Sequence, residues 1–166
     1  HYNSPKESIK KAPTPFTTST LQQSSSNEFK LSPKATMKAC QSLYEGGFIT
    51  YMRTDSTTYS EEFIEKMKKY IEKSYSNEYV RTDIQQLCLR NDKDTNTQEA
   101  HEAIRPTNVE LENVNKELGN NEYRVYKLIR RNTLESCMPP AKYSVIKAYI
   151  SAPEELKYDY TAEQVM

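Results

Sequence analysis

Apolar residues recur at helical spacing in three segments, and each segment is predicted to fold as a helix with one buried face. These helices are expected over residues 33–45, 61–73 and 121–136. Ser32 and Ser60 stand directly before the first two, where a serine hydroxyl can accept a hydrogen bond from a free backbone N–H of the first turn. Pro139 and Pro140 end the third, because proline lacks the N–H that would continue a helix.

Two further regions are rich in β-branched and aromatic residues, which favour strands. Residues 48–52 predict a short strand, and residues 142–151 and 157–161 predict a pair of strands. Residues 1–32 are rich in serine and threonine and show little apolar periodicity, so they are predicted to be a linker. A helical turn is expected over residues 100–104. This pattern predicts an α+β fold that is mostly α.

Composition narrows the possible functions. The 166 residues include 23 basic and 23 acidic side chains, so any DNA binding must be argued from local motifs rather than from a basic excess. No stretch of about 18 consecutive apolar residues occurs, so no membrane span is expected. Cys40, Cys88 and Cys137 lie far apart without a CxxC pair, which predicts buried thiols. The opening at His1 and the end inside a strand-like stretch predict a piece of a longer protein.

The segment around Tyr51 has the residue types of a phosphate site. Tyr51, Arg53 and Asp55 alternate with Met52 and Thr54, so a strand through them would point the three polar side chains to one face. A guanidinium can bind an oxyanion with two hydrogen bonds, and a phenol can supply an attacking oxygen. Spacing alone leaves open the alternative that these side chains only pack and contact solvent.

His101 is the one internal histidine. His101 and Glu102 match the start of the HExxH zinc motif, but Arg105 occupies the position of the second histidine, which excludes that zinc site. Two interpretations remain open on these grounds. His101 is either a structural histidine, or an imidazole that lies with Arg105 near a phosphate.

Three motifs, in order along the chain, resemble those of type IA DNA topoisomerases. Residues 43–56, LYEGGFITYMRTDS, are similar to the active-site signature of that family, in which the tyrosine of Tyr-x-Arg-Thr-Asp-Ser is the nucleophile. Residues 18–23, TSTLQQ, resemble an upstream string, and residues 100–107, AHEAIRPT, resemble a downstream histidine motif. Met52 after the nucleophile favours the bacterial topoisomerase I branch or reverse gyrase over the topoisomerase III branch.

The resemblance implies a domain organisation. Residues 12–141 would form a helical domain with a CAP-like, winged-helix-like core, which carries the catalytic tyrosine and acts as a lid over DNA. Residues 1–11 and 142–166 would be flanking segments of a neighbouring β domain.

The resemblance also implies an isomerase mechanism. Tyr51 would attack a phosphate of single-stranded DNA and form a 5′-phosphotyrosyl intermediate. A second strand would then pass before religation, so that negative supercoils relax without ATP. Arg53 and His101 would assist catalysis, and Arg53, Asp55 and Arg105 would contact DNA. For Asp55, a solvated turn carboxylate is the equal alternative.

The family's Mg²⁺ is implied to bind elsewhere. In type IA topoisomerases an acidic cluster in a separate TOPRIM domain holds Mg²⁺, and no Asp-x-Asp-x-Glu string occurs here, so no metal ligand is expected in this chain. The implied partners are single-stranded DNA and the TOPRIM and other domains of a parent enzyme, located in the cytoplasm with the nucleoid if bacterial. The alternatives are a non-catalytic DNA- or partner-binding module with the same fold, or a phosphate-binding signalling domain.

Overall fold

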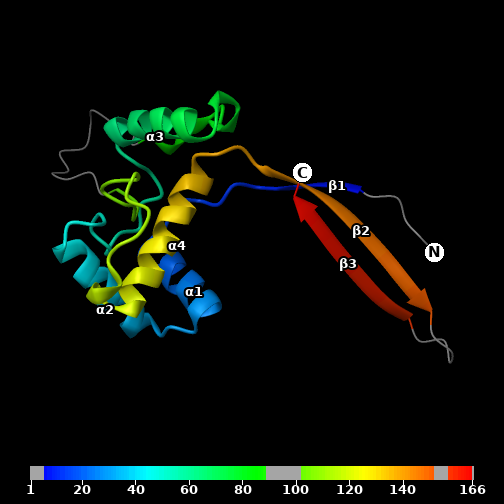
Figure 1. The fold of residues 1–166 in the computed structure, drawn as a ribbon, viewed down its shortest axis with the longest axis horizontal. Coiled ribbons are helices and arrows are strands. Elements are labelled where there is room, and N and C mark those ends of the chain that lie inside the picture. The colour runs from blue at the N-terminus through cyan, green and yellow to red at the C-terminus, as the bar shows by residue number, and fades with distance from the viewer. Residues whose placement is uncertain (1–5, 89–101, 152–156, 166) are drawn as a thin grey trace. The chain divides into compact units, whose positions relative to one another are not determined.

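A computed structural model describes residues 6–88, 102–151 and 157–165 (Figure 1). The chain divides into two compact units, one of residues 13–138 and one that joins residues 1–12 to residues 139–166. The first contains helices and the second contains strands, so the predicted α+β fold, mostly α, is confirmed. Within the described ranges, no helix has the length and apolar character needed to cross a membrane.

The helical unit is built on four α-helices within its described residues. They are α1 (Thr18–Phe29), α2 (Pro33–Glu45), α3 (Glu61–Ser74) and α4 (Asn120–Ser136), with short 3-10 helices η1 (Asn77–Tyr79), η2 (Ile84–Leu87) and η3 (Lys116–Leu118). The predictions for α2, α3 and α4 are confirmed to within one residue at each end. Ser32 and Ser60 cap α2 and α3 as predicted, since their hydroxyls accept hydrogen bonds from backbone N–H groups of the first turns.

Helix α1 lies in the region that was predicted to be a linker. That prediction is wrong for Thr18–Phe29 and for Lys6–Lys10, which form strand β1. Thr17 and Thr20 form a capping box, in which each threonine side chain accepts a hydrogen bond from the backbone N–H of the other. Leu21 and Ser25 are the buried residues of this helix. One buried apolar residue is too few to give a periodic apolar pattern in the sequence. The helix is specified instead by its capping box and by the residues that pack against it.

Two apolar clusters form the core of the helical unit, and the segment between α2 and α3 is anchored in both. Ile49 and Met52 are buried in the cluster that contains residues of α1, α2 and α4. Tyr59 is buried in the cluster around α3. Six residues separate Met52 from Tyr59, so the chain between these anchors is short and is held at both ends.

The cysteines agree with the expectation of buried thiols at two of three positions. Cys40 and Cys137 are buried, Cys88 is partly exposed, and all three are free thiols. Burial raises the pKa of the Cys40 thiol to about 12. Burial likewise raises the pKa of Cys137 to about 11. Neither thiol is therefore ionised near neutral pH, and both behave as core side chains.

The sheet unit contains β1 (Lys6–Lys10), β2 (Ala141–Ser151) and β3 (Lys157–Val165), in the order β1-β2-β3 with antiparallel pairing. The predicted strand pair at the end of the chain is confirmed, and β3 extends to Val165. The pairing of β1 with β2 joins the two ends of the chain in one sheet. That the unit belongs to a neighbouring β domain of a longer protein stays a prediction.

Two short elements differ from their predictions. Residues 48–52 form no strand, and only Ile49 makes an isolated bridge, with Pro106. Proline has no N–H with which to continue a ladder of backbone hydrogen bonds. The helical turn expected over residues 100–104 is also wrong where it is described, since residues 102–104 form no helix and Ile104 makes an isolated bridge with Phe16. Residues 100 and 101 lie outside the described residues.

Candidate active site

Tyr51 lies in an irregular segment that connects α2 to α3. Tyr51 is 45% exposed, whereas Met52 is 1% exposed and packs in the core. Arg53 and Asp55 are exposed as well. The predicted alternation of polar and apolar positions is therefore present as an alternation in exposure, although the strand that motivated it is absent.

Threonine side chains join this segment to residues 103–107. The Thr50 hydroxyl donates to the backbone oxygen of Ala103 at 2.9 Å and accepts from the backbone N–H of Arg105 at 3.0 Å. The Thr107 hydroxyl donates to the backbone oxygen of Gly47 at 2.6 Å. These contacts span more than fifty residues of sequence and bring the described part of the histidine motif beside Tyr51.

Thr18, the first residue of α1, contacts the backbone on both sides of Arg53. Its hydroxyl donates to the Met52 oxygen at 2.6 Å and accepts from the Thr54 N–H at 3.0 Å. The backbone N–H of Thr18 donates to the Thr54 oxygen at 3.0 Å. The upstream motif thus lies against the Tyr51 segment. This role of Thr18 could not be recognised from the sequence, because the contacts connect residues 34 and 36 positions apart.

Tyr51 packs against Tyr44 of α2, with ring centroids 5.2 Å apart in an edge-to-face arrangement. Tyr44 is 42% exposed, so both phenols are accessible. Tyr59, by contrast, is fully buried and its hydroxyl lies 3.0 Å from the Ser136 hydroxyl. Burial is the main cause that raises the pKa of Tyr59 above that of a free phenol. Tyr59 is therefore unsuited to act as a nucleophile.

The Arg105 side chain is mostly buried and is paired with a neighbouring carboxylate. Its side chain is 13% exposed and donates two hydrogen bonds to the Glu102 carboxylate, at 2.5 and 3.0 Å. The guanidinium also lies 4.0 Å from the ring centroid of Phe63 on α3. This arrangement ties residues 102–105 to α3. The DNA contact expected of Arg105 stays a prediction.

The Glu102–Arg105 pair makes a prediction about stability. Burial raises the pKa of the Glu102 carboxyl, but hydrogen bonds and the charge of Arg105 outweigh burial and leave that pKa lowered. The pair therefore stabilises the fold above the pKa of a free glutamate, and this contribution is lost as the pH falls through the lowered value. Glu102→Gln is expected to lower the free energy of unfolding at pH 7 by about 1–3 kcal/mol.

The measurement is urea unfolding of this chain and of the variant at several pH values. The difference between them should shrink as the pH falls below the pKa of a free glutamate, about 4.3, because the wild-type carboxylate becomes protonated as the pH passes its lowered pKa. A difference that does not depend on pH would contradict the electrostatic interpretation.

The remaining predicted site residues are placed only in part. His101 lies outside the described residues, so its role stays a prediction. Arg53 and Asp55 make no ion pair with one another or with any other described side chain. Among the described residues there is no group of three or more His, Cys, Asp or Glu side chains that could hold a metal ion.

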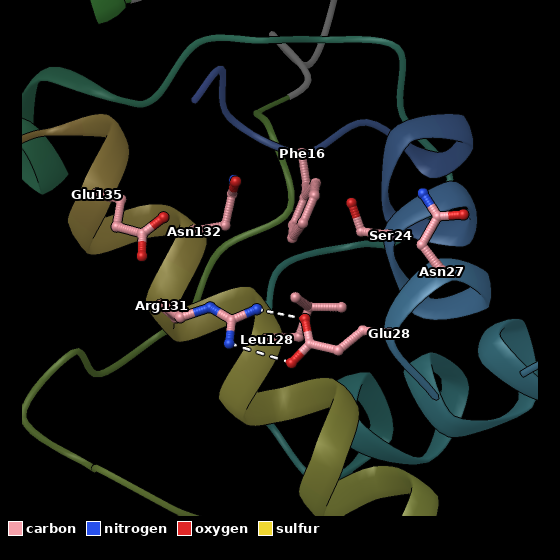
Figure 2. A pocket seen from close by; sticks show the side chains of 8 residues that line it. All are labelled: Phe16, Ser24, Asn27, Glu28, Leu128, Arg131, Asn132 and Glu135. Carbon is pink, nitrogen blue, oxygen red and sulfur yellow. Dashed lines mark hydrogen bonds and ion pairs between the residues drawn. The ribbon is translucent and has the colours of Figure 1, made fainter. Parts of the chain in front are cut away.

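Tyr51 and Arg53 do not line the hollow shown in Figure 2, which lies between α1 and α4 and has a volume of about 350 Å³. Glu28 of α1 and Arg131 of α4 face each other across it in a two-pronged ion pair. Asn132 donates to the backbone oxygen of Thr14 at 3.1 Å. The Glu28–Arg131 pair fixes α1 to α4, and the Asn132 hydrogen bond fixes the chain before α1 to the same helix. Through α1 the ion pair supports the segment that carries Tyr51 and Arg53.

The chain was compared with protein families and with known proteins. A family model described as DNA topoisomerase matches residues 3–166. A "DNA topoisomerase 1 type prokaryotic" of Acanthamoeba polyphaga mimivirus is 47% identical over 138 residues, which cover 82% of this chain and 16% of that protein. DNA topoisomerase 1 of Buchnera aphidicola is 43% identical over 148 residues, covering 89% of this chain and 17% of that protein.

A solved structure is also similar. Full-length topoisomerase I of Thermotoga maritima aligns with a TM-score of 0.66 and 31% identity, over 99% of this chain and 28% of that one. The chain spans less than a fifth of the length of the two relatives compared above.

Proposed function

Because this chain belongs to the type IA DNA topoisomerase family, we propose that it is the part of such an enzyme that carries the nucleophile, and that Tyr51 is that nucleophile. The observation that carries the proposal is the placement of Tyr51, which is 45% exposed beside the exposed Arg53, while Met52 between them is anchored in the core. A phenol held in this way can reach a polymer that lies across the surface.

The proposed reaction is a reversible transesterification on single-stranded DNA. The Tyr51 oxygen forms a bond to phosphorus, the bond from phosphorus to the 3′ oxygen breaks, and the phenol's proton replaces phosphorus on the released 3′-hydroxyl. The phosphate stays on the 5′ end as a phosphotyrosyl ester. Passage of a second strand and reversal of the reaction relax negative supercoils. One phosphodiester is exchanged for another, so ATP is not needed.

Arg53 is proposed to bind the scissile phosphate. A phenol is a weak nucleophile at neutral pH, and a cation near the phosphate stabilises the charge that develops in the transition state. His101 is proposed to assist by hydrogen bonding or proton transfer. Asp55 and Arg105 are also proposed to contact DNA, but they are secondary to Arg53. The described contacts of the Arg105 side chain are to Glu102, Phe63 and Pro106.

We propose that the Mg²⁺ of the reaction is bound outside this chain. The described residues contain no cluster of His, Cys, Asp or Glu side chains suited to a metal ion, so these residues do not fit Mg²⁺ and no step is assigned to it here. We assign Mg²⁺ to the TOPRIM domain of the parent enzyme. The proposed partners are that domain, the other domains of the enzyme and single-stranded DNA, with a location in the cytoplasm at the nucleoid if the source is bacterial.

The proposed domain organisation follows the same family. Residues 12–141 would be the lid that opens and closes over DNA, and residues 1–11 and 142–166 would belong to a neighbouring β domain. The division of the chain near residues 12 and 139 supports this proposal. A non-catalytic DNA- or partner-binding module with the same fold is the competing function.

The test is to map the covalent intermediate. The full-length enzyme is mixed with a single-stranded oligonucleotide, denatured, digested with protease and analysed by mass spectrometry. The DNA adduct is expected on the peptide that contains Tyr51, at the tyrosine oxygen. An adduct on Tyr44 would refute the assignment of the nucleophile. No adduct from an enzyme that binds the oligonucleotide would favour the non-catalytic module.

The isolated 166-residue chain is expected to be inactive. It should neither relax a supercoiled plasmid nor form a covalent DNA adduct with added Mg²⁺, because the proposed metal site and its companion groups lie in another domain. Plasmid relaxation on agarose gels is the measurement, with the full-length enzyme as the positive control. Mg²⁺-dependent relaxation by the pure chain would show that catalysis does not need the second domain.

A further inference from the structure

We propose that Thr18 is a positioning residue, which directs Arg53 toward the scissile phosphate by holding the two peptide groups on either side of Arg53. The inference rests on the proposed function of Tyr51 and Arg53, and it assigns a role to the first residue of α1. Thr18 itself would not touch the DNA. Its effect on the reaction would pass through the backbone of Arg53.

The geometry of the Thr18 hydroxyl carries this proposal. The hydroxyl donates to the Met52 oxygen, which belongs to the peptide group before Arg53. It accepts from the Thr54 N–H, which belongs to the peptide group after Arg53. One oxygen therefore holds both peptide planes that meet at Arg53, and the orientation of these planes sets the direction in which the side chain leaves the backbone.

The segment has few other means of fixing Arg53. Residues 53–57 form no helix or strand, so no ladder of backbone hydrogen bonds orients them. The Arg53 side chain is exposed and makes no ion pair with a described residue. Met52 is anchored in the core, but a buried neighbour alone leaves the rotation of the next peptide group free. The Thr18 contacts remove that freedom.

Helix α1 provides a firm support for this contact. Leu21, one turn after Thr18, is completely buried. The capping box of Thr17 and Thr20 closes the first turn around Thr18, and the pair of Glu28 with Arg131 fastens the other end to α4. The placement of α1 is thus set by the core and by α4, and the Thr18 hydroxyl transmits this placement to Arg53.

The chain offers a matched control within the same helical turn. Thr18→Val removes the hydroxyl and keeps the shape of the side chain, and Thr18→Ser keeps the hydroxyl. Thr20→Val makes the same chemical change at a residue whose hydroxyl accepts from the Thr17 N–H and has no described contact with residues 52–54. The Thr20 variant therefore reports the effect of a weakened helix start alone.

The experiment measures single-turnover cleavage of a single-stranded oligonucleotide by the full-length enzyme at saturating DNA. Thr18→Val is expected to slow cleavage about 10- to 100-fold, because a misplacement of about 1 Å costs on the order of 10²-fold in rate. Thr18→Ser should recover most of the loss, and Thr20→Val should cleave within about threefold of wild type. Binding of uncleaved oligonucleotide should change less than the rate. If Thr18→Val fails to fold, Thr18→Ala replaces it with the same expectation.

A double-mutant cycle tests the route through Arg53. In an Arg53→Ala background, Thr18→Val should add less than about threefold, since there is no longer a guanidinium to direct. Losses that multiply, or a Thr18→Val enzyme that cleaves like wild type, would overturn the inference while leaving the nucleophile untouched. Covalent complex formed by Tyr51→Phe would instead overturn the proposed function, so the two failures are distinguishable.

Discussion

Tyr51→Phe in the full-length enzyme is expected to abolish DNA cleavage without unfolding the protein. The substitution removes the attacking oxygen and keeps the ring, whose edge-to-face contact with Tyr44 is made by carbon atoms. The hydroxyl of Tyr51 has no described hydrogen bond that its removal would break, and the residue is 45% exposed. Covalent complex formed with an end-labelled oligonucleotide, resolved on a denaturing gel, should fall below detection. Thermal unfolding should match that of wild type.

Two other tyrosines serve as controls for this substitution. Tyr44→Phe keeps the ring contact with Tyr51 and should retain cleavage. Tyr59→Phe removes a buried hydroxyl that is hydrogen bonded to Ser136, so it should lower stability by about 1 kcal/mol and leave the chemistry intact. Covalent complex that persists in Tyr51→Phe and disappears in Tyr44→Phe would identify Tyr44 as the nucleophile instead.

The sequence predicts those elements whose causes are local. Helices α2 and α3 begin after Ser32 and Ser60, and the capping hydroxyl and the apolar stripe of each helix lie within a few residues of one another. Helix α1 could not be recognised in this way. Its buried face contains Leu21 and Ser25, and its position depends on contacts such as that of Glu28 with Arg131, 103 residues further along the chain.

The candidate site likewise combines features that are local in the sequence with contacts between residues far apart in the sequence. The alternation around Tyr51 predicted that Tyr51, Arg53 and Asp55 share one face, and the motif resemblance pointed to Tyr51 and Arg53. All three residues are exposed, although the backbone there is not a strand. The Thr18 and Thr50 contacts that arrange this backbone are long-range, so neither periodicity nor spacing could reveal them. For Arg105, the sequence showed a positive charge near the site, but it did not show that this charge is paired with the Glu102 carboxylate.

Arg53→Ala is expected to slow cleavage on the order of 10²–10³-fold, the scale of losing one donor to a developing oxyanion. The fold should be unaffected, because the Arg53 side chain is exposed and makes no ion pair with a described residue. The measurement is the single-turnover rate of oligonucleotide cleavage by the full-length enzyme from about pH 5.5 to about pH 9, a range that brackets histidine titration. Unfolding temperatures measured in parallel check the fold.

Arg53→Lys distinguishes charge from geometry at the same position. An ammonium keeps the positive charge but cannot make the planar two-pronged contact of a guanidinium, so it should recover only part of the lost rate. Full recovery would mean that Arg53 acts as a charge alone, which would remove the reason for orienting its backbone through Thr18. His101→Ala is the companion variant, and its loss should appear mainly as an altered pH profile near pH 6.5, about the pKa of a free imidazole. An unchanged rate and profile in that variant would make His101 a structural residue and leave Arg53 as the principal group at the phosphate.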